Sequence, residues 1–391
     1  MSVSIIGNKC CACKTCMVAC PVAAVKIVID SDGYEQIAVD DKVCIQCGLC
    51  EKVCPILSVP RLSEKEPLSC GAACAKNEQT KYQGSSGGLF GVLAYSTFRK
   101  NGVVYGAAFD ELLNLKTTRV EKEGEIAPLF KSKYLLCDTG ESFKNIKLDL
   151  DKGREVLYCS SPCQIAALRN FIKKEYANLL TVEFVCHGIG PQSLFTKSID
   201  YIQRKKHVNI THYEFRFKKN NASSHYYYYY YGVRKGRPYY DNGLYLFDPY
   251  YNAYCKQWVC REECYRCPYA QESRAADITI GDFHNINHFI PKLDRFKGIS
   301  MFRVNSTKGS NKFAEVCDEI NVYPFEWKNI RNQNRFHSGG EPPKERQQLL
   351  KSVKEIGFDA TARTLLNPYK DYKRLVYYHL PSWLRKIIVS L

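Results

Sequence analysis

The sequence lacks any long apolar run, and this absence argues against a membrane-spanning protein. No stretch of the 391 residues reaches the ~18 consecutive apolar residues that a membrane-spanning helix needs. We also expect no secretory signal peptide, because Met1 leads almost directly to Cys10 and leaves no room for charged, apolar and cleavage regions. We therefore expect a cytoplasmic protein with two or three domains.

Blocks of basic residues are absent as well, although the formal net charge is +16. The lysines and arginines are spread along the chain, without the runs that mark nucleic-acid-binding tails. A basic surface that offsets bound anionic groups, or that docks an acidic protein, accounts better for this charge. We therefore expect no nucleic-acid partner.

Cysteine, in contrast, is abundant. Eight of the 20 cysteines form two copies of one pattern, C-x-x-C-x-x-C-x-x-x-C-P, at residues 10–21 and 44–55. Three thiolates at i, i+3 and i+6 can surround one face of an iron–sulfur cubane, whereas the fourth thiolate serves the other cluster. The spacing therefore predicts two [4Fe–4S] clusters, the first held by Cys10, Cys13, Cys16 and Cys54, and the second by Cys44, Cys47, Cys50 and Cys20.

Zinc ions and disulfides account for this pattern less well. Zinc closes a tetrahedron with four ligands and has no use for the longer run that ends in proline, and disulfides suit small secreted proteins. Cluster thiolates need a reducing compartment, and exposed clusters favour an anaerobic or microaerobic host. Cys11 lies outside the ligand spacing, so we expect it to pack as a small apolar side chain.

The cysteine pattern defines a ferredoxin-like domain at residues 1–60. Between its two halves, residues 26–30 and 35–39 are predicted strands around the turn Ser31-Asp32-Gly33. Residues 60–69 are polar and bracketed by prolines, which is typical of a linker. Cys70 and Cys74 follow at a spacing that matches neither half, and we expect them to be structural.

From residue 70 the sequence predicts an α/β core. Residues 84–88, Gly-Ser-Ser-Gly-Gly, precede an apolar helical run at 89–98, and such a turn suits a phosphate or pyrophosphate, although most such turns are plain helix caps. Strands are predicted at 102–109, 155–158 and 181–185, and a helix at 165–174. The loops after these strands lie at the carboxyl ends of the strands, where open α/β sheets bind their ligands.

Six motifs in this region occur in one order. They are Ser-Ser-Gly-Gly at 85–88, Val-Val-Tyr-Gly at 103–106, Ser-Lys-Tyr at 132–134, Pro-Cys-Gln at 162–164, Cys-His-Gly at 186–188, and the segment from Cys264 through Cys267 to Asp277 and Phe283. Over residues 70–290 the chain resembles the beta subunit of the coenzyme F420 (deazaflavin) hydrogenase/dehydrogenase family, with the ferredoxin domain fused in front. The resemblance implies an FAD-containing core with a further [4Fe–4S] cluster beside the flavin.

For this third cluster, Cys264 and Cys267 supply two thiolates on one turn, and Cys163 and Cys186 lie on strand-end loops that could meet them. A single C-x-x-C is ambiguous between metal, redox pair and chance, and the resemblance favours the cluster. Cys260 is an alternative to either loop cysteine. Buried thiols are expected at Cys137, Cys159, Cys255 and Cys317.

For the flavin, the resemblance places the pyrophosphate at the turn of Ser85, Ser86, Gly87 and Gly88. Lys133, followed by Tyr134, could offset the pyrophosphate charge or lie near the ring edge that becomes anionic on reduction. Ser160, Ser161 and Gln164 are placed to hydrogen-bond the ring. His187 adjoins the predicted ligand Cys186, where a structural hydrogen bond to the cluster is favoured over proton donation. The family commonly has Trp-Gly after Phe283, whereas this chain has His284 and Asn285, which leaves the substrate side undefined.

Two segments carry no family motif. His225 is followed by six tyrosines at 226–231, and such an aromatic run favours a strand at a sheet edge over a stacking platform for nucleic-acid bases. The C-terminal segment, residues 340–391, has a residue pattern typical of helices, and its end contains Trp383, Arg385 and Lys386. That tail could make weak contact with a membrane surface, but a terminal helix docked on the core is the simpler interpretation.

The sequence thus predicts an α+β protein: a two-cluster ferredoxin-type domain (1–60), a flavin-binding core with a mixed sheet (70–150 and 151–325) and a helical extension (326–391). The predicted function is an oxidoreductase that passes electrons between an organic substrate at FAD, deazaflavin or another compound, and a one-electron carrier such as ferredoxin. The alternative is a non-catalytic electron-transfer subunit of a larger complex. A homo-oligomer is compatible with the sequence, which does not reveal the substrate.

Overall fold

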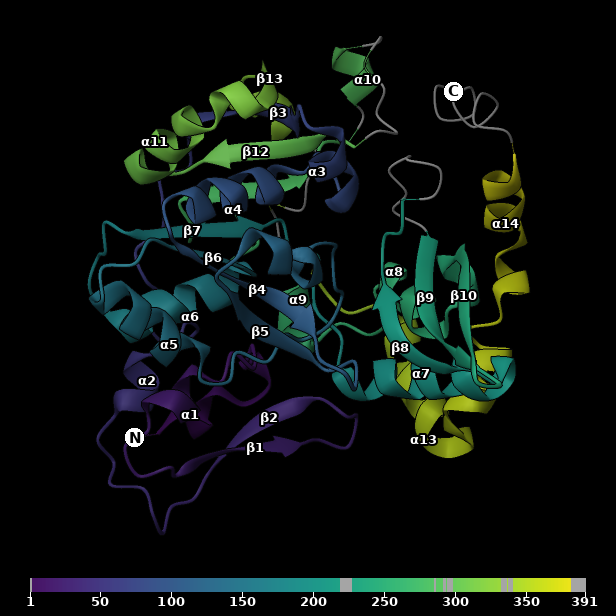
Figure 1. The fold of residues 1–391 in the computed structure, drawn as a ribbon. Helices are drawn as coiled ribbons and strands as arrows, with labels where there is room; N and C mark the ends of the chain where they lie inside the picture. The colour runs from purple at the N-terminus through teal and green to yellow at the C-terminus, as the bar shows by residue number, and fades with distance from the viewer. Residues whose placement is uncertain are drawn as a thin grey trace.

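The computed structural model describes residues 2–218, 227–284, 286–290, 293, 298–331, 336 and 340–380. These residues form a cysteine-rich N-terminal module, a large sheet covered by helices, and a smaller unit built on a three-stranded sheet (Figure 1). The α+β fold class predicted from the sequence is confirmed.

The core is an eight-stranded mixed sheet with the strand order β13-β3-β12-β11-β7-β6-β4-β5. Its strands are β3 (Ser69–Ala75), β4 (Val103–Phe109), β5 (Leu115–Val120), β6 (Val156–Ser160), β7 (Leu179–Phe184), β11 (Ile278–Asp282), β12 (Ser300–Val304) and β13 (Ile320–Pro324). Neighbouring strands are parallel from β4 through β6 and β7 to β11, and the other pairs are antiparallel. Parallel strands need cover on both faces, and β6 and β7 are accordingly buried along most of their length.

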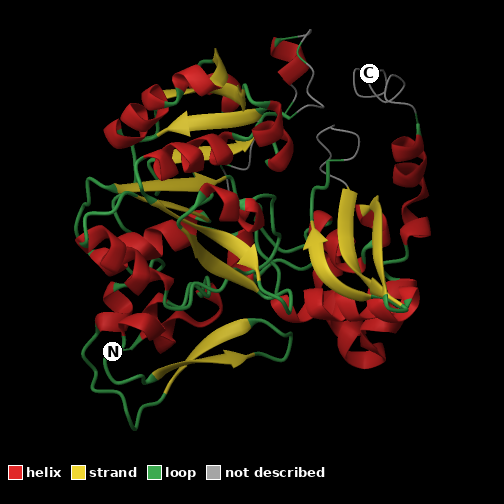
Figure 2. Ribbon diagram, viewed as in Figure 1, coloured by secondary structure: helices red, strands yellow, loops and turns green. Residues whose placement is uncertain are grey.

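Helices supply that cover (Figure 2). On one face α4 (Leu89–Arg99) packs its apolar side against β3, β4 and β12. On the other face α5 (Ser142–Asp151) and α6 (Pro162–Ile172) form an apolar cluster that also contains Cys11 and Cys13 of the N-terminal module. The other short elements around the sheet are α3 (Glu78–Gln83), η2 (Glu123–Glu125), η3 (Ala127–Leu129), α9 (Glu262–Tyr265), α10 (Ile286–Phe289), α11 (Thr307–Glu315), η7 (Cys317–Glu319) and α12 (Trp327–Ile330).

The N-terminal module lies against the α5–α6 face of the sheet. It contains η1 (Val3–Lys9), α1 (Thr15–Ala19), β1 (Val25–Ile29), β2 (Glu35–Val39) and α2 (Leu49–Lys52), and the predicted hairpin is the antiparallel pair β1–β2. Buried hydrogen bonds fix it to the core: the Arg261 guanidinium donates to the Cys10 carbonyl at 2.9 Å, the Thr139 hydroxyl to the Cys13 carbonyl at 2.9 Å, and the Tyr34 hydroxyl to the Val259 carbonyl at 3.1 Å.

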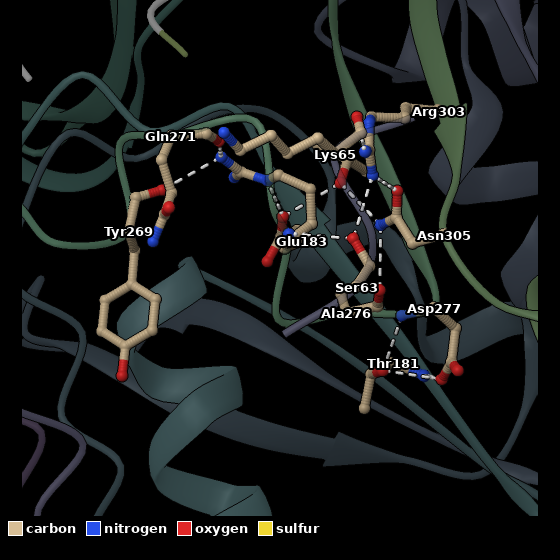
Figure 3. Close-up of polar contacts among 12 residues, drawn as sticks. Ser63, Lys65, Thr181, Glu183, Tyr269, Gln271, Ala276, Asp277, Arg303 and Asn305 are labelled. Atoms are coloured by element: carbon tan, nitrogen blue, oxygen red, sulfur yellow. Dashed lines mark hydrogen bonds and ion pairs between the residues drawn. The ribbon is translucent and has the colours of Figure 1, made fainter. Parts of the chain in front are cut away.

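The predicted linker has no helix or strand between residues 60 and 68, but it is not a free tether. The Ser63 N–H donates to the Arg274 carbonyl at 2.9 Å. The Arg303 Nη2 donates to the carbonyls of Glu64 at 2.8 Å and of Lys65 at 2.6 Å (Figure 3). Because Arg303 belongs to β12 and is fully buried, these bonds hold the linker against the sheet.

The smaller unit is rich in aromatic residues. Its sheet has the order β10-β9-β8, made of β8 (Asn209–Glu214), β9 (Tyr227–Arg234) and β10 (Arg237–Leu244), and it packs with α7 (Gln192–Lys206), η5 (Tyr245–Phe247), α8 (Pro249–Cys255) and α13 (Lys344–Thr364). Tyr228 and Tyr230 face its core, as alternation predicts. The prediction of an edge strand is wrong, because β9 is the central strand. His225 and Tyr226 lie outside the described residues.

The C-terminal segment is helical as far as it is described. After α13 it contains η8 (Pro368–Asp371) and α14 (Tyr372–His379), and the Arg374 guanidinium donates to the Tyr245 hydroxyl at 2.9 Å. The tail with Trp383, Arg385 and Lys386 lies outside the described residues. Across the described part of the chain, no helix combines the length and apolar character that crossing a bilayer requires.

Candidate functional site

A large cavity opens at the carboxyl ends of the parallel strands β6, β7 and β11. Its walls come from the turn before α4, the segment 129–137, the strand ends 159–161, 184–189 and 280–282, and Arg216 and Tyr254 of the smaller unit. The position agrees with the rule that open α/β sheets bind ligands beyond the carboxyl ends of their strands. Almost all of the predicted flavin-binding residues meet here.

The turn before α4 forms one end of the cavity. Ser85, Ser86 and Gly88 line it, and Gly88 caps the helix with a φ of +84°, a conformation that favours glycine. Gly87 does not line the cavity, because its N–H donates to the Ser300 hydroxyl at 2.9 Å and it packs against β3 and β12. The turn is therefore fixed to the sheet, and the helix start, rather than Gly87, faces the cavity.

Three basic residues near this turn were not predicted as site residues. Lys131 and Arg216 line the cavity, and the Lys218 ammonium donates to the Ser86 carbonyl at 2.8 Å. Burial, helped by neighbouring cations, lowers the pKa of Lys218 to about 7 and that of Lys131 to about 8. Arg216 forms a bidentate pair with Asp282, both N–O distances being 2.8 Å. No local motif links these positions, since they converge only in the folded chain.

Lys133 and Tyr134 also line the cavity. The Lys133 ammonium donates to the carbonyls of Pro128 at 2.7 Å and Phe130 at 2.5 Å, and burial lowers its pKa to about 7. The Tyr134 ring stacks on Tyr254 with a centroid distance of 4.3 Å and an interplanar angle of 18°. The sequence thus provides a cation and a flat aromatic wall beside one another.

The remaining predicted residues lie at the far end of the cavity. Ser160, Ser161, Gln164 and His187 all line it. The Ser160 hydroxyl donates to Gln164 Oε1 at 2.5 Å, and Gln164 Nε2 donates to the Cys137 carbonyl at 2.7 Å. These groups hold one another in position, so a ring ligand would find an ordered polar edge there. The His187 side chain is exposed on this wall.

A second, smaller cavity adjoins this end. It is lined by all four cysteines predicted for the third cluster, Cys163, Cys186, Cys264 and Cys267, together with Cys11. The alternative ligand Cys260 does not line it. The Cys260 side chain is fully buried, packs in the apolar cluster of the aromatic unit, and lies near the His187 carbonyl (3.9 Å). We call this space the cysteine cavity.

Gly188 allows the two cysteine-bearing loops to meet. It has a φ of +107°, and a Cβ at this position would lie 2.7 Å from the Cys260 Sγ and 3.3 Å from the Cys264 Cβ. Only glycine lets the 186–188 loop approach the 260–264 segment so closely. This contact explains the Cys-His-Gly order of the motif.

The electrostatics of the cysteine cavity suit a cationic cluster core. Burial and neighbouring thiols raise the pKa of Cys264 to about 12 and that of Cys267 to about 11. Four such thiolates are stable together only when bound metal neutralises them. Within the described residues, no group of three or more His, Cys, Asp or Glu side chains is placed to hold a single metal ion. The four thiols line a common cavity.

The predicted ligand cysteines of the N-terminal module lie close to one another in the fold. A third cavity is lined by Cys20 together with Cys44, Cys47 and Cys50. Cys10, Cys16 and Cys54 belong to one buried cluster, and Cys13 interacts electrostatically with Cys10, Cys16 and Cys54. Cys20 thus lies near the cysteines of the second half of the pattern, and Cys54 lies near those of the first.

The cysteines outside these sets are placed differently. Cys70 and Cys74 are buried in β3, and Cys137, Cys159 and Cys255 are half-buried, the first two on the wall of the large cavity. The prediction that Cys317 is buried is wrong, because it lies exposed in η7. Cys11 is buried as expected, but it touches predicted cluster ligands as well as apolar side chains.

A buried polar network holds the chain that follows Cys267. The Arg274 guanidinium donates to the carbonyls of Tyr269 at 3.0 Å and Gln271 at 2.9 Å and forms an ion pair with Glu183 of β7. The Arg274 and Glu183 side chains are 2% and 0% exposed. Around them, Arg303, Asn305, Asp277 and Thr181 extend the network across the sheet (Figure 3). The loop that carries Cys267 is therefore anchored to the core of the sheet.

Two sets of four cysteines in a small module, joined to a sheet that carries a further cysteine cavity, define an iron–sulfur protein of the electron-transfer class. Comparison with known families agrees. Residues 153–326 match the family model for the carboxyl-terminal part of the coenzyme F420 hydrogenase/dehydrogenase beta subunit, and residues 9–56 match the model of the 4Fe-4S dicluster domain. These matches support the family that the motifs predicted, the coenzyme F420 hydrogenase/dehydrogenase beta subunits.

Further comparisons were made with curated proteins and solved structures. The search of curated proteins returned no match. A chain of the F420-reducing [NiFe] hydrogenase complex from Methanosarcina barkeri, studied as a xenon derivative, is similar in structure, with a TM-score of 0.45 and 13% sequence identity. The similarity covers 75% of this chain and 94% of that chain.

Proposed function

We propose that this chain is an iron–sulfur flavoprotein oxidoreductase, which passes electrons between an organic two-electron substrate at FAD and one-electron carriers through three [4Fe–4S] clusters. The observation that carries the proposal is the common wall of the large cavity and the cysteine cavity. Both are lined by Cys11, Ser161, Cys163, Cys186, Gly188 and Ile189. A flavin in the first cavity and a cubane in the second would share these residues as a common wall.

The residues of the large cavity fit FAD. Among the described residues around it, four basic side chains, Lys131, Lys133, Lys218 and Arg216, lie near the carboxylates of Glu214 and Asp282. Such an excess of buried positive charge beside a helix N-terminus suits a diphosphate. Elsewhere on the cavity wall, the Tyr134–Tyr254 stack and the polar edge of Ser160, Ser161 and Gln164 suit a flat heterocycle with hydrogen-bonding groups.

When bound, FAD supplies two-electron chemistry with organic compounds, and the clusters exchange those electrons one at a time. The chain's own side chains determine where this takes place. Ser85, Ser86, Gly88, Lys131 and Lys218 would hold the diphosphate. Lys133 and His187 are the proposed catalytic residues, because both side chains line the cavity and can exchange a proton or balance a developing negative charge.

The second cluster set provides the route to a carrier. Cys47 is exposed, and the neighbouring Val43 and Ile45 are 43% and 61% exposed. A cluster at this surface can meet a soluble carrier such as ferredoxin, whereas the first set is buried. The proposal includes the division into a ferredoxin-type domain (1–60), a core (70–150 and 151–325) and an extension (326–391), and the reducing cytoplasm of an anaerobe as its setting.

The test is the cofactor content of the full chain purified without oxygen. Iron, sulfide and flavin are counted, and the visible spectrum is followed while organic reductants, reduced deazaflavin among them, are added. We expect one flavin and about twelve irons per chain, three cubanes of four irons each. A preparation reconstituted with iron, sulfide and FAD that retains no flavin would contradict the proposal.

Binding of FAD should weaken as the pH rises from 7 to 9. In the free chain the pKa values of Lys133 and Lys218 are about 7 and that of Lys131 is about 8, because burial disfavours the charged forms. A bound diphosphate favours the protonated form of these amines. At a pH above their pKa values in the free chain, the protein must therefore take up protons when FAD binds. The dissociation constant should then rise by up to about tenfold per pH unit for each proton taken up.

Flavin fluorescence measures this dependence in the iron-loaded protein. In Lys218→Met the dependence on pH should be shallower and binding weaker at pH 6.5. Lys100→Met serves as a control, because Lys100 is half-exposed and paired with Glu315 outside the cavity. An affinity that stays constant or increases with pH would show that these lysines do not hold the diphosphate.

A further inference from the structure

Helix α8 of the aromatic unit contacts two walls of the large cavity through two tyrosine hydroxyls. Tyr250 and Tyr254 are four residues apart, so their side chains lie on the same face of the helix. The Tyr250 hydroxyl donates to the Tyr134 carbonyl at 2.7 Å, and the Tyr254 hydroxyl donates to the Gly188 carbonyl at 3.1 Å. Both tyrosines are buried. Each hydroxyl therefore fixes one backbone position on a different wall.

The two carbonyls belong to segments with different proposed roles. Tyr134 ends the Ser-Lys-Tyr motif, in which the Ser132 hydroxyl donates to the Ser85 hydroxyl of the turn before α4 at 3.0 Å. Gly188 ends the Cys-His-Gly motif, which carries Cys186, a predicted ligand of the third cluster. We call residues 132–134 the flavin-side segment and residues 186–190 the cluster-side loop. Helix α8 is bonded to both.

Three successive carbonyls of the cluster-side loop accept hydrogen bonds from three different segments. The pairs are the Gly188 carbonyl with the Tyr254 hydroxyl, the Ile189 carbonyl with the Arg261 N–H at 2.9 Å, and the Gly190 carbonyl with the Leu136 N–H at 3.0 Å. The first of these three bonds comes from a side chain, so a substitution can remove it and leave the other two donors in place. Gly190 also packs tightly on Tyr250, because a Cβ at Gly190 would lie 2.3 Å from the Tyr250 hydroxyl oxygen.

We propose that Tyr250 and Tyr254 are positioning residues, which hold the flavin-side segment and the cluster-side loop at one fixed spacing. This inference rests on the proposed function, because it assigns the two tyrosines to electron transfer between the flavin and the third cluster. Both tyrosines keep their protons and electrons throughout. Tyr254 also supports the flavin-side segment with its ring, which stacks on the Tyr134 ring.

The physical reason is that a buried carbonyl which loses its donor is unfavourable, so the backbone around it shifts towards another partner. A shift of the Gly188 carbonyl displaces Cys186, which lies two residues earlier in the same loop. A shift of the Tyr134 carbonyl displaces the Lys133 and Tyr134 side chains, which line the large cavity. Loss of the Tyr254 hydroxyl should therefore affect the cluster, and loss of the Tyr250 hydroxyl should affect flavin binding.

The experiment compares three tyrosine-to-phenylalanine variants of the full-length protein, loaded with iron, sulfide and FAD without oxygen. In Tyr254→Phe, electron transfer from the reduced flavin to the third cluster should slow by about 10–100-fold, the usual effect of removing a group that orients metal ligands. Stopped-flow absorbance measures this rate. The electron paramagnetic resonance signal of the third cluster should change shape, while the iron and flavin contents stay at the wild-type values.

Tyr250→Phe should give the complementary result. The dissociation constant of FAD, measured by flavin fluorescence, should rise by about two- to tenfold, as expected for the loss of one hydrogen bond. The signal of the third cluster should stay as in the wild type. Because each variant keeps its aromatic ring, the packing of α8 is retained in both.

Tyr245→Phe is the matched control, because Tyr245 is also buried in the aromatic unit and its hydroxyl accepts from Arg374 away from the cavity. It should keep the wild-type transfer rate, cluster signal and flavin affinity. If Tyr254→Phe behaves like this control, or if Tyr250→Phe and Tyr254→Phe change the same quantities equally, the positioning role is contradicted. If the wild-type protein itself binds no flavin or has no third cluster, the proposed function fails, and this inference fails with it.

Discussion

Replacing Cys264 and Cys267 together by serine should remove about four of about twelve irons from the anaerobic protein. The two cysteines line one cavity with Cys163 and Cys186, and no other described cysteine except Cys11 lines it. A cubane that loses two of its four thiolates is not retained, whereas both sets in the N-terminal module remain complete. Iron analysis and electron paramagnetic resonance should therefore show the loss of one cluster signal and the survival of two.

Cys260→Ser is the matched control for this loss. Cys260 lies four residues before Cys264 and is buried, but its thiol faces the aromatic unit instead of the cysteine cavity. The variant should keep its full iron content. If Cys260→Ser loses four irons and the double variant loses none, Cys260 is a cluster ligand. That result would contradict the third site as described.

Replacing Arg274 by methionine should lower the free energy of unfolding by about 3–5 kcal/mol, the effect of leaving one member of a buried ion pair without its partner. Glu183 is fully buried, and its Oε1 accepts from Arg274 and from the Thr279 hydroxyl. The substitution also removes the bonds to the Tyr269 and Gln271 carbonyls, which hold the loop after Cys267 (Figure 3). The third cluster should be the first to be lost.

Guanidinium unfolding, followed by circular dichroism without oxygen, measures this destabilisation. Arg99→Met is the control, because the Arg99–Glu319 pair is 53% and 39% exposed and should contribute no more than about 1 kcal/mol. Adding Glu183→Leu to Arg274→Met should recover part of the stability, since neither member of the ion pair is then buried without the other. Equal destabilisation by the Arg99 and Arg274 substitutions would show that burial of the pair is unimportant.

The sequence predicted best the features that depend on local spacing. The placement of Cys20 with Cys44, Cys47 and Cys50 follows from the length of the x3 step, which turns the fourth thiolate away from its own set. The strand-end loops with Cys163 and Cys186 were predicted from short apolar runs followed by turns. Parallel neighbours place such loops at one edge of the sheet, so their convergence could be expected.

Features that depend on contacts between residues far apart in the sequence were not predicted. Lys131 and Lys218 meet at the start of α4 only because the aromatic unit folds back on the core, and no local motif marks them. The tyrosine run was correctly predicted as a strand, but its central place depends on pairing with β8 on one side and β10 on the other. Cys317 was predicted buried because cysteines usually are, yet it lies in an exposed turn.

The anchored linker has a consequence for how the protein works. Some redox proteins carry a cluster on a swinging arm that travels between donor and acceptor. Here Ser63, Glu64 and Lys65 are bonded to Arg274 and Arg303, and the module itself is bonded to the core through Arg261 and Thr139. Folding thus fixes the distances between the predicted cluster sites of the N-terminal module and the cysteine cavity of the core. Under the proposed function, an electron carrier would therefore have to bind at the surface of the N-terminal module.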